Sequence, residues 1–120
     1  MDIVKIIAQA IVGIGIYNVW LLRSSKSTAW RGGESKSMKE EFSTYGLSEV
    51  ALYIVGFLKL TFATLLIVGI WVPSIVEVAA LGMCILMSGA IAMHVKIKDP
   101  LIKSLPAATL LALSIMIVLI

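Results

Sequence analysis

The chain is too apolar to fold as a soluble domain of its length. Of its 120 residues, 60% are hydrophobic and only 14% are charged, and the mean hydropathy is +1.04. A soluble domain needs more polar surface than this to cover its core. The net charge is +3, and a basic patch for nucleic acid would need far more free surface than this chain offers. We therefore expect one membrane domain over residues 1–120, with membrane lipids around it and no nucleic-acid partner.

Four apolar stretches have the length of membrane-spanning helices. A helix needs roughly 20 apolar residues to cross a bilayer, and all four stretches are rich in Leu, Ile, Val, Ala and Gly, as membrane helices are. The short alternating runs of a membrane β-barrel do not occur. The sequence therefore predicts an all-α fold, a bundle of four transmembrane helices. We expect them at about 3–22, 50–72, 74–95 and 101–120, with a polar loop at 23–49.

The first helix carries small residues and ends in polar and aromatic ones. Gly13 and Gly15 allow a close approach of other helices, and the third helix has a similar small-residue face with Gly82 and Gly89. These faces indicate tight packing within the bundle and make a homo-oligomer an expectation. Asn18 stands near the end of the first helix, where its amide oxygen can serve a buried donor.

The polar loop contains a short amphipathic helix. Ser37 and Glu40 have the spacing of a capping box, and Gly46 is a natural C-terminal stop. Its apolar positions recur at helical spacing, at Met38, Phe42 and Tyr45. Such a helix either lies on the membrane surface or docks onto the mouth of the bundle, and the sequence leaves both placements open.

The second helix holds a lysine near its middle. Lys59 lies roughly 13 Å from the end of its helix at about 1.5 Å per residue, where a lysine costs about 2.5–3.5 kcal/mol on insertion scales. By depth, Tyr53, Asn18 and Tyr17 are the expected oxygen partners. Two readings stay open, a hydrogen-bonded structural lysine whose stem reaches toward the interface and a charge that faces a ligand or partner.

Glu77 is the obvious counter-ion for Lys59 by charge but not by depth. It begins the third helix just after the outer turn, roughly 14 Å from Lys59 along the membrane normal at the helical rise. Lys5 lies at nearly the same depth as Glu77. We therefore predict a structural ion pair between Lys5 and Glu77.

The third helix carries methionines and the single cysteine. Met83, Met87 and Met93 either line an adaptable lipophilic pocket or form ordinary core. Cys84 has no partner for an intramolecular disulfide, and one histidine cannot supply a recognisable metal cluster or bis-histidine haem ligation. We expect no catalytic site, no metal and no resident cofactor, with a quinone or a lipid as the ligand to consider.

The stretch HVKIKDPLIKSLP joins the third and fourth helices. His94 stands where the third helix leaves the membrane. Asp99 and Pro100 fit the start of the fourth helix, with the aspartate as N-cap and the proline at the first helical position.

The basic residues predict the orientation. Both loops lie on one side of the membrane, and that side holds eight Lys and Arg residues, whereas the other side holds only Lys5. The positive-inside rule places loops 23–49 and 96–100 in the cytoplasm and both termini outside. We expect an integral protein of the bacterial inner membrane.

Two segments resemble a known family. GAIAMHVKIKDPLIKSLPA, preceded by EEFSTYGLSEVALYIVGFLKLTFATLLIVGIWVP, looks like the DoxX-like family of small four-helix membrane proteins. The phenylalanine–glycine segment, the glycine-bearing second helix and the His–x4–Asp–Pro–Leu turn carry the resemblance over residues 38–115. Where that family usually has an acidic residue in the second helix, this chain has Lys59.

The resemblance implies a membrane accessory protein with His94 and Asp99 as signature positions. The family takes its name from a subunit associated with a membrane thiosulfate:quinone oxidoreductase, and a eukaryotic branch assists the assembly of receptor channels. We therefore hold two hypotheses. The first is a non-enzymatic accessory or assembly protein that binds other membrane proteins or a lipophilic ligand. The second is a subunit of a quinone-linked redox system, and it predicts a polar pocket that contains both His94 and Lys59.

Overall fold

The computed structural model of the chain describes residues 3–22, 32–33 and 35–120. Within these ranges the chain is helical and has no strand, so the predicted all-α class is confirmed. The elements are α1 (Ile3–Tyr17), the π-helical η1 (Asn18–Leu22), α2 (Met38–Thr44), α3 (Glu49–Val68), η2 (Pro73–Ile75), α4 (Val76–Lys96), η3 (Leu101–Ser104) and α5 (Leu105–Leu119).

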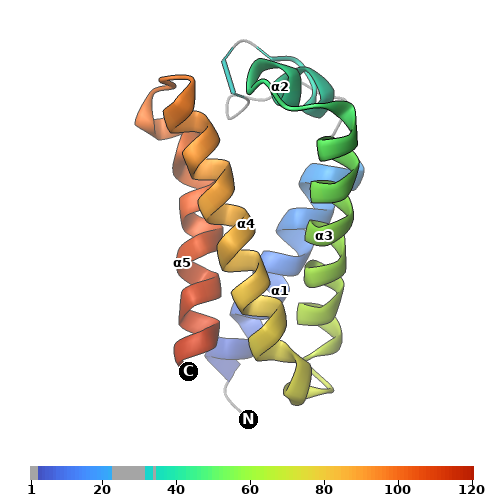
Figure 1. Ribbon diagram of the computed structural model, residues 1–120. Coiled ribbons are helices and arrows are strands. Elements are labelled where there is room, and N and C mark those ends of the chain that lie inside the picture. The colour runs from blue at the N-terminus through green and yellow to red at the C-terminus, as the bar shows by residue number, and fades with distance from the viewer. Residues whose placement is uncertain (1–2, 23–31, 34) are drawn as a thin grey trace.

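Four helices run the length of the molecule and form an elongated bundle (Figure 1). The helical stretches Ile3–Leu22, Glu49–Val68, Pro73–Lys96 and Leu101–Leu119 are each long and apolar enough to cross a membrane. This confirms the four predicted spans. Around the bundle, α1 packs against α3 and α5, and α4 packs against α3 and α5. Both chain ends lie at one end of the bundle, here called the terminal end, and α2 lies at the other, the α2 end (Figure 1).

At the terminal end the helices pack closely because glycines leave room for large side chains of the neighbouring helix. A side chain at Gly13 would meet Ile67 of α3 at 2.6 Å, and one at Gly82 would meet the Phe62 ring at 2.5 Å. Gln9 is buried there, and its Nε2 donates to the carbonyl oxygen of Leu66 at 2.9 Å. The core of this end consists of Ala8, Val12, Ala63, Leu66, Val76, Ala79, Ala80 and Met83.

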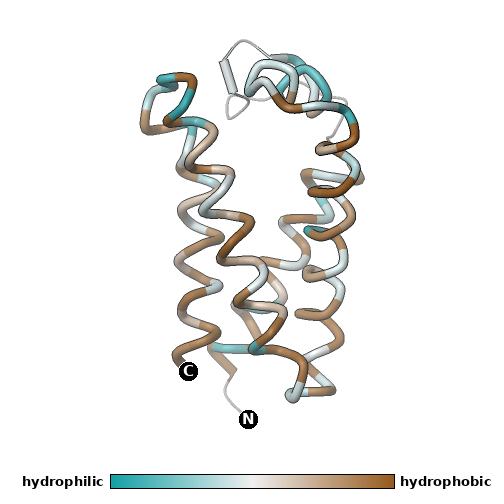
Figure 2. The backbone as a smooth tube through the Cα atoms, in the orientation of Figure 1, coloured by the Kyte–Doolittle hydropathy of each residue, from teal (hydrophilic) through white to brown (hydrophobic). Residues whose placement is uncertain are grey.

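At the α2 end, polar residues gather over the mouth of the bundle (Figure 2). The Ser37 hydroxyl accepts from the Glu40 amide at 3.2 Å, as the capping box predicts, although the Glu40 carboxylate reaches back to the Lys36 amide and not to that of Ser37. Gly46 ends α2 with φ of +80°, and the Leu47 amide donates to the Phe42 carbonyl. The apolar face of α2 is buried, with Met38, Phe42 and Tyr45 only 5–7% exposed. Of the two placements that the sequence left open, α2 adopts docking onto the bundle.

The structure corrects two further expectations, one at the start of the fourth helix and one within α4. Asp99 was predicted to cap the fourth helix, but Pro100 is the N-cap of η3 and no side chain caps that turn. The Asp99 carboxylate instead accepts a hydrogen bond from the distant Gly33 amide. Gly89 was predicted on a tightly packed face with Gly82, yet a side chain added at Gly89 would meet nothing within 4 Å.

Candidate functional site

A cavity of about 810 Å³ lies beneath α2 and is lined by residues of all four long helices. Its walls are mainly apolar and include Val55, Leu86, Met87, Met93 and Leu110. Its polar lining comes from Asn18, Glu41, Tyr45, Lys59, His94 and Lys103. The cavity therefore brings together four of the six residues predicted for ligand or partner binding, namely Asn18, Lys59, Met87 and His94.

Lys59 lines this cavity from α3, next to the π-helical turn that ends the first membrane helix. Trp20, in that turn, packs onto α3 at Gly56, where a side chain would meet the indole ring at 2.7 Å. The Lys59 ammonium lies 5.3 Å from the centroid of the Trp20 ring, a cation–π arrangement. The side chain is 9% exposed, and among the described residues no hydrogen bond or ion pair reaches its nitrogen.

The oxygen partners predicted for Lys59 are elsewhere. Tyr53 is 65% exposed, and its hydroxyl donates to Glu49 at 3.1 Å. The Tyr17 hydroxyl is hydrogen-bonded to Thr64. Asn18 lines the cavity but makes no hydrogen bond with Lys59 in the described part of the chain. Depth along the membrane was the wrong criterion, because the side of the helix decides which groups meet.

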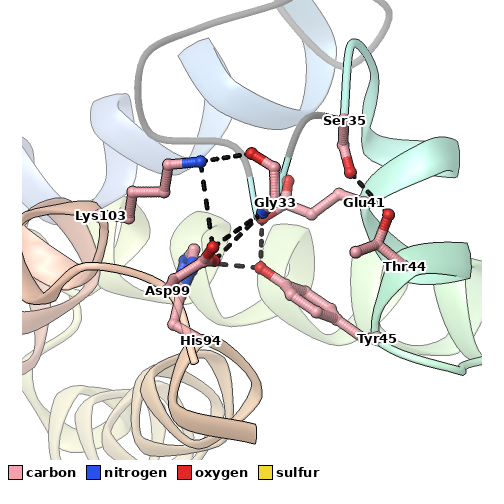
Figure 3. Close-up of polar contacts among 8 residues, drawn as sticks. All are labelled: Gly33, Ser35, Glu41, Thr44, Tyr45, His94, Asp99 and Lys103. Atoms are coloured by element: carbon pink, nitrogen blue, oxygen red, sulfur yellow. Dashed lines mark hydrogen bonds and ion pairs between the residues drawn. The ribbon is translucent and has the colours of Figure 1, made fainter. Parts of the chain in front are cut away.

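A row of hydrogen-bonded side chains crosses the α2 end (Figure 3). The Tyr45 hydroxyl donates to Glu41 at 2.5 Å and lies 3.4 Å from His94 Nε2. On the other side of the imidazole, Nδ1 lies 2.8 Å from Asp99 Oδ2. Four side chains from α2, α4 and the following turn thus form one row, here called the polar row: Glu41, Tyr45, His94 and Asp99.

The Asp99 end of the polar row anchors the polar loop. The Gly33 amide donates to both Asp99 oxygens, at 3.0 and 3.2 Å. The Lys103 ammonium donates to the Gly33 carbonyl and lies 3.9 Å from the Asp99 carboxylate. Burial by itself raises the pKa of Asp99, but the hydrogen bonds from His94 and the Gly33 amide and the charge of Lys103 outweigh it. The pKa of Asp99 therefore lies below its ordinary value, and the group stays ionised.

The Tyr45 hydroxyl lies within reach of both Glu41 and His94. It has one hydrogen, so Tyr45 can donate to Glu41 or to His94 but not to both.

The predicted pair of Lys5 and Glu77 does not form. Ion pairs between described residues join Lys39 to Glu49 and join Asp99 to both His94 and Lys103, and Glu77 is exposed. The methionines divide between the two readings, because Met83 is fully buried core whereas Met87 and Met93 line the cavity. Within the described residues, no group of three or more His, Cys, Asp and Glu side chains is placed to hold a metal.

Sequence reasoning missed the residues that join the loop to the bundle. A side chain at Gly32 would meet the Tyr45 ring at 2.5 Å, and Gly33 has φ of +57°, a conformation that glycine adopts without strain. Two adjacent glycines in a polar loop were the available signal. Glu41 was missed as well, because its approach to the cavity depends on where α2 docks.

Comparison with known proteins agrees with this architecture. The chain matches the DoxX-like family over residues 25–117, a range that includes α2, α3, α4 and most of α5. No curated protein and no solved structure matches the chain at a significant level. Because the match covers well over half of the chain and the four apolar helices fit it, this protein belongs to the DoxX-like family of membrane proteins.

Proposed function

We propose that the protein is a non-enzymatic membrane protein that binds a lipophilic molecule in the cavity beneath α2. The cavity supports this proposal because its volume, about 810 Å³, lies in the range of roughly 300–1,000 Å³ that is typical of small-molecule sites. Its apolar walls and its few convergent polar groups are also typical of such sites. A packed bundle without a ligand would instead close this space, as the terminal end does.

The ligand reaches the cavity from the bilayer. Ile85 and Leu105 line the cavity although they are 73% and 52% exposed, and Gly89 lines it with open space where a side chain would stand. These residues lie on membrane-spanning helices, so their exposed surface faces lipid. At the aqueous side, α2 covers the mouth of the bundle.

The polar row supports binding over catalysis. Tyr45, His94 and Asp99 direct their hydrogen bonds to one another and to the Gly33 amide. This pattern braces the cover of a cavity, whereas a catalytic group is aimed at a site where the substrate sits. We also propose an accessory role, in which the ligand-bearing bundle binds other membrane proteins.

The orientation also belongs to the proposal. The α2 end carries Lys36, Lys39, Lys96, Lys98 and Lys103, whereas the terminal end carries Lys5. By the positive-inside rule, the α2 end faces the cytoplasm and both termini lie outside, in a bacterial inner membrane. The ligand then enters from the cytoplasmic leaflet.

A quinone-linked redox role is the second candidate, and one observation favours it. Lys59 and His94 line the same cavity, as this hypothesis requires for contact with a quinone headgroup. It predicts that His94→Ala changes quinone reduction in membranes that carry the protein. Unchanged electron flow in that variant removes this candidate and leaves the binding function in place.

Native mass spectrometry of the gently extracted protein tests the binding function. We expect a bound lipid-like molecule on the wild-type chain, and its mass distinguishes a quinone from a lipid. Gly89→Phe places a ring in the open part of the cavity and should remove the adduct. Val78→Phe adds the same ring to α4 at a residue that is 66% exposed and outside the cavity, so it should keep the adduct. A wild-type chain without any adduct, or equal adducts on all three proteins, contradicts the proposal.

A further inference from the structure

We infer that the cavity binds a single-chain amphiphile whose anionic headgroup, a carboxylate or a phosphate monoester, contacts the ammonium of Lys59. This inference rests on the proposed function, because it names the chemical class of the ligand for the same cavity. Three features of the cavity support it: the Lys59 ammonium lacks an acceptor, the other charged groups nearby have partners, and the apolar space suits one chain.

Lys59 is a buried cation without an acceptor among the described residues. It is 9% exposed and lies within a membrane-spanning helix. The buried side-chain nitrogens and oxygens of the described residues all have hydrogen-bond partners, so the Lys59 nitrogen, which has none, must border open space. The space that it borders is the cavity. A charge held out of water needs a counter-ion or acceptors to offset its desolvation.

The Trp20 ring does not meet this need. Its centroid lies 5.3 Å from the ammonium, and a cation–π contact contributes about 1–2 kcal/mol, less than an ion pair in a dry site. The ring also occupies one side of the ammonium only. The three N–H bonds of a lysine ammonium leave donors that point away from the ring toward the cavity.

The other charged groups of the α2 end already have partners. Lys96 donates to the Tyr45 carbonyl oxygen at 2.8 Å, and Lys103 is held by the Gly33 carbonyl and by Asp99. Glu41 accepts from the Tyr45 hydroxyl at 2.5 Å and forms no ion pair with Lys59 within the described ranges. Glu41 acts on Lys59 through its charge, yet Lys59 is the cation of the cavity that has no hydrogen-bond acceptor among the described residues.

The apolar part of the cavity suits one hydrocarbon chain. Leu86, Met87, Met93 and Leu110 line it, and the flexible methionines adapt to a mobile chain. The opening at Ile85 and Gly89 leads to the surrounding lipid. A single tail can thus lie in the cavity or leave through this opening while its headgroup stays on Lys59.

Competition between four probes of equal tail length tests the inference. The purified protein in a nonionic detergent is mixed with equal amounts of dodecanoic acid, dodecyl phosphate, dodecanol and dodecylamine, and occupancy is read by native mass spectrometry. We expect the two anions to exceed dodecanol by about tenfold or more, the gain of one charge-assisted hydrogen bond. Preference for the carboxylate indicates a fatty acid as the natural source, and preference for the phosphate indicates a single-chain phospholipid.

Three variants assign the preference to Lys59. Lys59→Met keeps an unbranched side chain that lacks only the terminal ammonium, and it should lower both anions to the occupancy of dodecanol without changing dodecanol itself. Lys59→Arg keeps the charge and should keep the preference, which guards against a folding defect in the first variant. Lys39→Met removes an exposed lysine from α2 and should leave all four occupancies unchanged.

The outcomes separate this inference from the proposed function. Equal occupancy of all four probes, or a preference that survives in Lys59→Met, overturns the inference but leaves a lipophilic cavity. Preference for dodecylamine also overturns it and indicates that Glu41 sets the selectivity. Absence of binding by every probe overturns the proposed function itself.

Discussion

The two ends of the bundle use similar residues to opposite effect. At the terminal end, Gly13 and Gly82 bring the helix backbones together, and the core between them is buried and tightly packed. At the α2 end the helices surround a cavity of about 810 Å³ whose walls are mainly apolar and include a few charged and hydrogen-bonding groups. The closed end needs only small side chains, whereas the open end needs a separate cover, which α2 and the polar row supply.

Two glycines on α4 show where the difference arises. Gly82 and Gly89 are seven residues apart, so they lie on the same face of the helix. The Phe62 ring of α3 fills the space beside Gly82. One heptad earlier on α3 stands Val55, which lines the cavity together with Gly89. A glycine on α4 therefore does not by itself close the bundle, because close packing at Gly82 also needs the Phe62 ring of α3.

The largest effect is expected from overfilling the closed end. Gly82→Ile places a branched side chain where the Phe62 ring already lies 2.5 Å from the Cβ position. We expect a loss of about 3 kcal/mol in the free energy of unfolding, measured by denaturation in mixed micelles, because overpacking shifts backbones. Gly89→Ile makes the same change on the same face of α4 and should alter stability by less than about 0.5 kcal/mol. Equal losses in the two variants would show that the two ends are not packed differently.

The closed end was largely predictable from the sequence, because its signals are local. Four apolar stretches of spanning length, Gly13 and Gly82 for close approach, and a turn at Pro73 specify it without knowledge of distant contacts. At the open end, the cap at Ser37 and the stop at Gly46 were predicted as well, because these two signals are also local.

The open end was not predictable in this way, because its contacts join residues far apart in the chain. Asp99 followed by Pro100 is a good local signal for a helix start, yet the carboxylate binds the Gly33 amide, 66 residues away. Hydrogen bonds with a buried amide and an imidazole stabilise the Asp99 carboxylate more than capping the first turn of η3 would. The positions of Glu41 and Trp20 likewise depend on how α2 and the π turn dock, which no periodicity in the sequence specifies.

A smaller effect, with a defined pH dependence, is expected at the anchor of the open end. Asp99→Asn removes the negative charge of the carboxylate that accepts hydrogen bonds from His94 and from the Gly33 amide. We expect this change to lower the free energy of unfolding by about 1.5 kcal/mol at neutral pH. Because the pKa of Asp99 is lowered in the folded protein, this stabilisation is complete above the unfolded pKa of about 3.9 and is lost as pH falls through the folded value.

Hydrogen exchange of the Gly33 amide measures this anchor directly. In the wild type, the exchange rate of the Gly33 amide, corrected for intrinsic rates, should rise only as pH falls well below about 4. In Asp99→Asn, the same amide should exchange quickly at every pH. Glu77→Gln removes an exposed carboxylate at the terminal end and should leave the Gly33 amide unchanged. Protection of Gly33 that persists in Asp99→Asn would mean that Lys103 and the Tyr45 ring, and not the carboxylate, hold the loop.

The smallest effect is expected from an ion pair on the outside of the same end. Lys39 of α2 lies 3.5 Å from Glu49 of α3, but the two side chains are 72% and 52% exposed, so water and salt screen their attraction. Lys39→Met should therefore change stability by less than about 0.5 kcal/mol, with even less effect at high salt. A denaturation series at two salt concentrations measures it. If Lys39→Met cost as much as Asp99→Asn, the cover would be held by surface charge, and the buried polar row would lose its distinctive role. A negligible cost leaves α2 attached through its buried face, and the cover of the cavity then depends on the residues beneath it.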